Sequence, residues 1–169
     1  PACRPASGPS PSVGSRAICW SKRSLEILDR LGVGAKCVEK GVIWKVGRTL
    51  HGNEEVWNFD LQPEPGHKMP AFVNLQQYYV EEYLVARAME FPDLIDLRWK
   101  NKVTGLSQSD HVTLTVETPD GSYQLEADHQ VACDGARSNI RAMMELDFDG
   151  ELFEERFLIA DIVMLSDFP

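Results

Sequence analysis

A turn between an apolar strand and a helix is the feature that most constrains this chain. The short, mostly apolar run Gln130–Cys133 predicts a strand, and Asp134 and Gly135 follow it at once. Glycine permits a tight turn, and the residues after it have helical character up to Met144. A strand, a turn and a helix start therefore meet at one carboxylate.

Such a junction suits a nucleotide cofactor. Backbone N–H groups at a helix start receive phosphate oxygens, and a carboxylate beside them accepts hydrogen bonds from sugar hydroxyls or ordered water. The residues alone also allow a plain strand-to-helix turn in which Asp134 is the helix cap. Both interpretations stay open on the local sequence.

The junction resembles the Asp-Gly motif of the flavin-dependent aromatic hydroxylases of the p-hydroxybenzoate hydroxylase type. In that motif hydrophobic residues precede Asp-Gly and Ser-x-x-Arg follows, and the matching residues here are Asp134, Gly135, Ser138 and Arg141. The resemblance implies that Asp134 and Gly135 bind FAD.

A second resemblance lies near the start of the chain. Residues 1–15 are rich in Pro, Gly and Ser, which predicts a loop or a disordered end, and Ser21 is the N-cap candidate of a helix over Lys22–Leu31. In the same family an Arg-Ala pair enters this helix, and its arginine contacts the flavin nucleotide. Arg16 matches that arginine, and a bidentate guanidinium suits pyrophosphate or ribose oxygens. The alternative is an exposed arginine on a loop.

A third resemblance concerns the predicted second helix, Asn74–Met89. Family members carry Gln-x-x-Leu-Glu-x-x-Leu at its start, with the glutamine near the flavin, and Gln77 takes that position here. Glu82 departs from the family, which often has Arg there. Asn74 and Gln77 also have the spacing of a capping box, which gives Gln77 a structural alternative.

Strands are predicted wherever apolar residues alternate with polar ones. The runs around Val42–Val46 and Trp57–Leu61 predict a hairpin with an aromatic face, in which Trp44, Trp57 and Phe59 are candidates to line a substrate. A three-stranded antiparallel meander is predicted from three runs, and a last strand from a fourth: Leu94–Trp99, Val112–Val116, Tyr123–Ala127 and Phe157–Leu165. The glycines at 32 and 34 do not form a G-x-G-x-x-G motif, because Cys37 replaces the third glycine and a helix precedes them.

The predicted fold class is α/β (α+β), a partial FAD/NAD(P)-binding Rossmann-like domain with an antiparallel substrate-domain β-sheet. Residues 16–37 and 74–169 are assigned to the FAD-binding domain with its meander, and residues 38–73 to the substrate-binding sheet. Compared with members of the resembled family, the chain lacks the N-terminal Gly-rich motif and the C-terminal Gly-Asp motif. We therefore expect a fragment of a larger enzyme.

Composition excludes several other classes. A net charge of −9 repels nucleic acid and anionic lipid, so no nucleic-acid or membrane partner is expected. The absence of a long apolar run or a signal-peptide pattern favours a cytoplasmic protein. Four separated cysteines predict free thiols, and four scattered histidines predict no metal site.

The resemblance implies a monooxygenase that hydroxylates a small phenolic substrate with FAD, NAD(P)H and O₂. Among the family's branches, the chain looks most like the 3-(3-hydroxyphenyl)propionate hydroxylases. A hypothesis from another class is a non-catalytic remnant that binds a partner or forms a homo-oligomer. Flavin absorbance of the purified protein separates the two.

Overall fold

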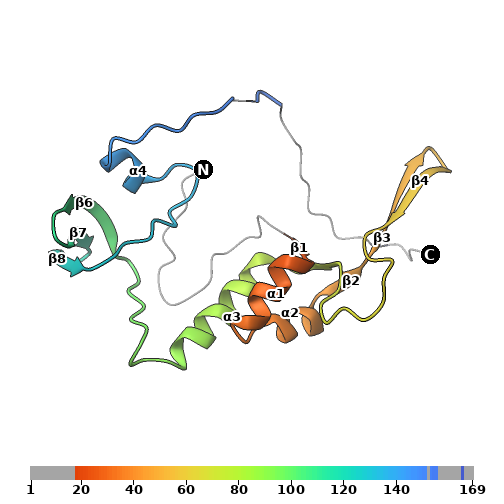
Figure 1. Ribbon diagram of the computed structural model, residues 1–169, viewed down its shortest axis with the longest axis horizontal. Coiled ribbons are helices and arrows are strands. Elements are labelled where there is room, and N and C mark those ends of the chain that lie inside the picture. Colours follow the sequence, from red (N-terminus) through yellow and green to blue (C-terminus); the bar gives the residue numbers. More distant parts are fainter. Residues whose placement is uncertain (1–17, 152, 156–164, 166–169) are drawn as a thin grey trace. The chain divides into compact units, whose positions relative to one another are not determined.

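The computed structural model describes residues 18–151, 153–155 and 165, and the described chain divides into two compact units. The first unit holds the chain up to residue 102 together with residues 118–121, and the second holds residues 103–117 and the chain from 122 onward. Each unit is described by itself. The predicted class, helices combined with antiparallel sheets, is confirmed (Figure 1).

In the first unit a three-stranded antiparallel sheet lies against helices (Figure 1). Its order is β1-β5-β2, so the strand that comes last in sequence is central. The elements of this unit are β1 (Cys19–Ser21), α1 (Lys22–Arg30), α2 (Gly34–Lys40), β2 (Val42–Trp44), β3 (Val46–His51), β4 (Glu54–Asp60), β5 (Phe72–Asn74) and α3 (Gln77–Met89).

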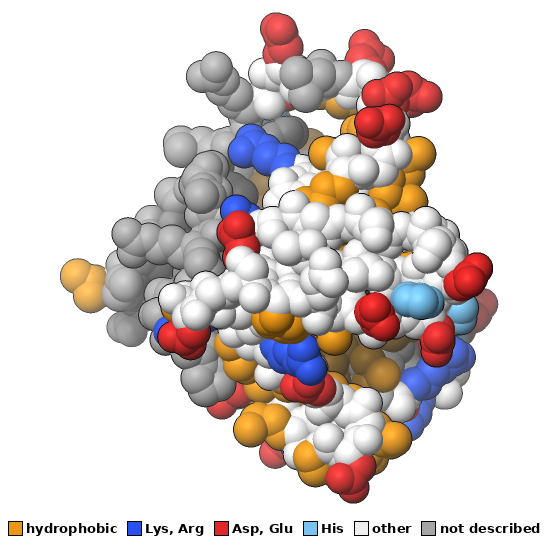
Figure 2. Space-filling model, turned by 90° about the vertical axis from the view of Figure 1, so that its left-hand side faces the viewer, with side chains coloured by type: hydrophobic (Ala, Val, Ile, Leu, Met, Phe, Trp, Pro, Cys, Tyr) orange, Lys and Arg blue, Asp and Glu red, His pale blue; other side chains and the backbone are white. Residues whose placement is uncertain are grey.

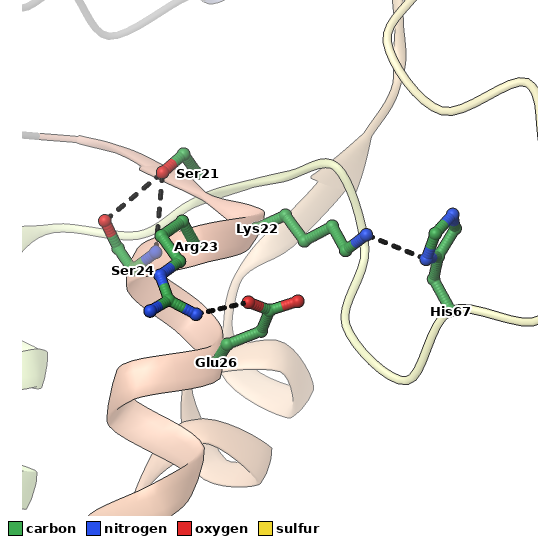
Figure 3. Close-up of polar contacts among 6 residues, drawn as sticks. All are labelled: Ser21, Lys22, Arg23, Ser24, Glu26 and His67. Atoms are coloured by element: carbon green, nitrogen blue, oxygen red, sulfur yellow. Dashed lines mark hydrogen bonds and ion pairs between the residues drawn. The ribbon is translucent and has the colours of Figure 1, made fainter.

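Helix α1 forms where the sequence predicts it. The Ser21 hydroxyl accepts a hydrogen bond from the Ser24 backbone N–H at 3.5 Å, which caps the helix start (Figure 3). Leu25 and Leu28 are buried on one side of the helix. Gly32 follows the helix at a φ of +84°, a backbone conformation that glycine adopts without steric cost.

The surface around the start of α1 is polar (Figure 3). The Lys22 ammonium lies 2.7 Å from His67 Nδ1, and the Arg23 guanidinium donates to Glu26 at 3.2 Å. His67 belongs to the loop that joins the β3–β4 hairpin to β5. The Lys22 contact therefore links that loop to α1.

Helix α2 was not predicted. It begins at Gly34, and a Cβ added there would stand 2.7 Å from the backbone of Asp29 in α1. Glycine at this position permits the close approach of the two helices. The Gly32-x-Gly34 run thus has a turning and packing role, in line with its rejection as a nucleotide motif.

The predicted hairpin begins later than expected. Strand β2 does not join it but pairs with β5, because the Trp44 indole stacks on Phe72 and donates to Asn74 Oδ1 at 2.8 Å. The hairpin itself consists of β3 and β4, which turn at Gly52 with a φ of +62°.

Helix α3 begins at Gln77, so the prediction of a start at Asn74 was wrong. Asn74 is the last residue of β5, and its side chain accepts the Trp44 N–H. A capping box between Asn74 and Gln77 is therefore not formed, because Asn74 is already committed to the sheet. Gln76 takes the N-cap position without a side-chain bond.

The first unit has one hydrophobic core between its helices and the β1-β5-β2 sheet. Val73, at the centre of the sheet, is fully buried, and so is Leu25 of α1. The buried members of this core are Leu25, Leu28, Val33, Cys37, Met69, Val73, Leu75 and Val80.

The second unit contains most of the meander of β6 (Lys102–Gln108), β7 (Val112–Thr118) and β8 (Gly121–Ala127), followed by the short helix α4 (Asn139–Met143). In β7 the buried residues alternate, at Val112, Leu114 and Val116, as the period-two pattern predicts. The strands that flank β7 supply the partly buried residues of this core.

Two predicted strands are absent from the described residues. Leu94–Trp99 is irregular, because the Leu94 and Ile95 N–H groups both bond the Phe91 carbonyl in a turn after α3. The first meander strand is instead β6. The run Gln130–Cys133 is also irregular, since no neighbouring strand pairs with it in the described part of the chain, and Val131 is 83% exposed. The predicted strand Phe157–Leu165 lies outside the described residues except for Leu165.

The burial of Leu25 in the core of the first unit predicts the cost of replacing this side chain by alanine. We expect Leu25→Ala to lower the free energy of unfolding by about 2–5 kcal/mol, because a fully buried leucine leaves a cavity. Ile27→Ala, two residues away at 47% exposure, should cost about 0.5 kcal/mol or less. Urea titration of both variants measures their free energies of unfolding. Equal losses of stability would contradict the placement of Leu25 in the core.

Candidate functional site

The Asp-Gly turn is the part of the predicted site that the structure describes in full. Gly135 has a φ of +83°, in the region that favours glycine, and helix α4 begins four residues later. Ser138 is the N-cap of this helix, and its hydroxyl accepts from the Arg141 N–H at 3.0 Å. The predicted order of turn and helix is confirmed, with Ser138 in the N-cap position that one interpretation gave to Asp134.

The Asp134 carboxylate is hydrogen-bonded within the turn at both oxygens. The Ser138 hydroxyl donates to Oδ1 at 2.6 Å, and the Ile140 N–H donates to Oδ2 at 3.1 Å. These bonds, led by the one from Ser138, hold the pKa of Asp134 below its ordinary value because they favour the ionised form. Asp134 is exposed, so solvent reaches this side chain.

The Arg141 side chain also contacts the turn. Its guanidinium donates to the Ala136 carbonyl at 2.9 Å and lies 4.8 Å from the centre of the Phe148 ring. The guanidinium therefore joins the turn to the segment that follows α4. These contacts give Arg141 a structural role in the turn.

The other predicted site residues lie elsewhere. Gln77 is half-buried at the first position of α3, in the first unit, and its amide donates to Glu81 at 2.6 Å. Asp134 and Gly135 belong to the second unit, so the described geometry brings these two together but does not relate them to Gln77. Arg16 lies outside the described residues.

The aromatic candidates separate into two groups. Trp44 belongs to the β1-β5-β2 sheet, where stacking on Phe72 and the bond to Asn74 give it a structural role. Trp57 and Phe59 lie on one face of the β3–β4 hairpin with ring centres 4.7 Å apart. Trp57 is 59% exposed, whereas Phe59 is half-buried with its ring against Gly47 of β3.

The face drawn in Figure 2 carries charged side chains of both signs. Figure 2 shows Asp and Glu side chains spread over the visible face, with Lys and Arg only in small groups. Within residues 18–151, 153–155 and 165, no group of three or more His, Cys, Asp or Glu is arranged to hold a metal ion. No helix in that part of the chain is long and apolar enough to cross a bilayer.

Ser138 is the residue whose role sequence reasoning missed. Its place in the Ser-x-x-Arg motif was noted, but its hydroxyl bonds both the Asp134 carboxylate and the Arg141 backbone. The signal was present, since serine three residues before a backbone N–H of a helix is a typical N-cap. The bond to Asp134 has no local signature.

Comparison with known proteins identifies the family of this chain as a class of FAD-binding proteins. Residues 8–169 match the FAD binding domain family, and the chain belongs to this family. A flavin-dependent monooxygenase of Mycobacteroides abscessus is 32% identical over 159 residues, which are 88% of this chain and 33% of that protein.

Two further relatives agree with this assignment. A 3-(3-hydroxy-phenyl)propionate/3-hydroxycinnamic acid hydroxylase of Mycolicibacterium smegmatis is 32% identical over 87% of this chain and 26% of its own length. The crystal structure of p-nitrophenol 4-monooxygenase from Pseudomonas putida DLL-E4 superposes with a TM-score of 0.76 at 29% identity, over 84% of this chain and 36% of that one. The predicted resemblance to flavin-dependent aromatic hydroxylases is confirmed, and the chain spans about a third of the length of these relatives.

The turn geometry predicts a local effect of Gly135→Ala. No atom lies within 4 Å of the position of an added Cβ, so the cost comes from the backbone alone, about 1–2 kcal/mol. The Ile140 and Arg141 amides should exchange with deuterium about 5- to 30-fold faster. Gly150→Ala, where the added Cβ also meets open space but φ is not positive, should leave both rates unchanged. Unchanged rates in Gly135→Ala would show that the turn tolerates alanine.

Proposed function

We propose that this chain is part of a flavoprotein monooxygenase that hydroxylates a phenolic substrate with FAD, NAD(P)H and O₂. The observation that carries the proposal is the match of residues 8–169 to the FAD binding domain family. Relatives named as a flavin-dependent monooxygenase and as aromatic hydroxylases support the reaction class. Because the chain spans about a third of their length, the activity is proposed for the longer protein.

The Asp134 turn fits a nucleotide cofactor. Gly135 has open space where a side chain would stand, so a ligand can approach the backbone closely. The Asp134 carboxylate is oriented, exposed and favoured in its ionised form, and such an acceptor suits the hydroxyl groups of a sugar or a ribityl chain. Asp134 and Gly135 are the residues we assign to FAD in this unit, and Arg16 and Gln77 are assigned by resemblance.

FAD, when bound, supplies the redox chemistry that transfers oxygen to the ring. The chain's own contribution is to bind the cofactor and to orient the substrate against it. The exposed Trp57 ring, beside the half-buried Phe59, offers planar apolar surface for an aromatic substrate. We further propose NAD(P)H as reductant, a cytoplasmic location and residues 38–73 as part of the substrate sheet.

A second function is supported by the exposed apolar residues of the first unit. Val42 and Ile43 in the edge strand β2 are 68% and 55% exposed, and unpaired edge strands favour association. A remnant that associates through this edge would be colourless and oligomeric, whereas the cofactor-binding protein carries flavin. Light scattering and the absorbance spectrum together distinguish these functions.

The proposal predicts a cost for Arg16→Lys in a longer protein that contains this chain. A lysine ammonium cannot reproduce two parallel N–H donors, and a lost charged hydrogen bond is worth roughly 1.5–3 kcal/mol. FAD affinity should fall about ten-fold or more in a fluorescence titration. Arg23→Lys is the matched control, since Arg23 is exposed and pairs only with Glu26 of its own helix in the described contacts.

The titration separates the assignment of Arg16 from the proposed function. Equal FAD affinity in Arg16→Lys and the unchanged protein would make Arg16 a surface arginine. Failure of the longer protein to bind FAD at all would overturn the proposed function itself.

A further inference from the structure

Ser138 combines burial with two polar contacts in the Asp-Gly turn. It is 9% exposed, and among the residues that the structure describes it is the single buried residue with a polar side chain. Its hydroxyl lies 2.6 Å from Asp134 Oδ1 and 3.0 Å from the Arg141 backbone nitrogen. Both distances fit hydrogen bonds.

The direction of the hydroxyl hydrogen follows from these partners. A backbone N–H only donates, so the Ser138 oxygen accepts from Arg141. The single hydroxyl hydrogen is then free to point at Asp134, whose carboxylate oxygen only accepts while it is ionised. The two bonds therefore support each other and fix both the side chain and its proton.

The fixed proton has a consequence for Asp134. Ser138 holds one carboxylate oxygen and the Ile140 N–H holds the other, so the carboxyl plane cannot rotate without breaking a bond. The donated hydrogens favour the ionised form, in agreement with the lowered pKa of Asp134. This contribution to turn stability is present while Asp134 is ionised and is lost as the pH falls through that lowered pKa.

We propose that Ser138 is a positioning residue, which orients the Asp134 carboxylate and keeps it a pure hydrogen-bond acceptor. This inference rests on the proposed function where it concerns the ligand: an oriented acceptor of this kind receives hydroxyl groups of the cofactor and rejects groups that can only accept. Ser138 itself makes no contact with the cofactor in this proposal.

The competing explanation is that Ser138 only caps α4. Glycine is also a favoured N-cap residue, so Ser138→Gly leaves α4 formed. It removes the hydroxyl donor to Asp134, however, and adds no charge beside that carboxylate. A cap alone predicts that Asp134 titrates in this variant as it does in the original chain, whereas a positioning role predicts a higher pKa for Asp134.

The test is a carboxyl titration of the chain without cofactor, followed by carbon NMR of the Asp134 side chain. In the unchanged protein the pKa of Asp134 should lie below its ordinary value. Ser138→Gly and Ser138→Ala should both move the titration midpoint upward, and Ser138→Thr should keep the low value because it keeps the hydroxyl. Ser122→Gly, at an exposed serine of β8, is the matched control and should leave the midpoint unchanged.

The Met144 amide, which donates to the Ile140 carbonyl at the end of α4, provides the second readout. Its hydrogen exchange in Ser138→Gly should match that of the original chain, which shows that the helix survives. An unmoved Asp134 midpoint in Ser138→Gly with the helix intact would overturn the positioning role and leave Ser138 a cap. Because no cofactor is present, this result is independent of whether the longer protein binds FAD.

Discussion

The first unit depends on β5, a strand of only three residues that is hydrogen-bonded on both sides. Phe72 stacks on Trp44, Val73 fills the core, and Asn74 accepts the Trp44 indole N–H. On the other side of the strand, the Trp20 indole donates to the Leu75 carbonyl at 2.8 Å. Each tryptophan thus buries apolar surface and satisfies its polar group at the same strand, which fixes where β1 and β2 lie.

This strand also explains which elements could be predicted from the sequence. Helix α1 was predicted because its cap, its leucines and its terminal glycine are all local signals. The start of α3 was not, because Asn74 is held by Trp44, thirty residues away in sequence. Local patterns likewise assigned β2 to a hairpin, although its side-chain partners lie in β5. Long-range partners decide such cases, and a single sequence does not display them.

In the candidate site, too, local signals predicted the structure and contacts between separated residues were missed. The turn, the glycine conformation and the short helix were predicted from Asp134, Gly135 and the residues after them. The preceding strand was not formed, because a strand needs a neighbour to pair its backbone groups. The bond from Ser138 to Asp134 was not predicted either, since it depends on how the turn folds back over four residues.

A carboxylate held by its own turn changes how the Asp-Gly motif is understood in this chain. Ser138 takes the N-cap position that one initial interpretation gave to Asp134, and the Asp134 carboxylate still accepts the Ile140 N–H of the same helix start. Internal bonds from Ser138 and Ile140 orient the Asp134 carboxylate, which is exposed. These bonds lie within the chain, so the carboxylate is oriented without any group from outside the turn. An added Cβ at Gly135 would meet no atom within 4 Å, which leaves the backbone there open.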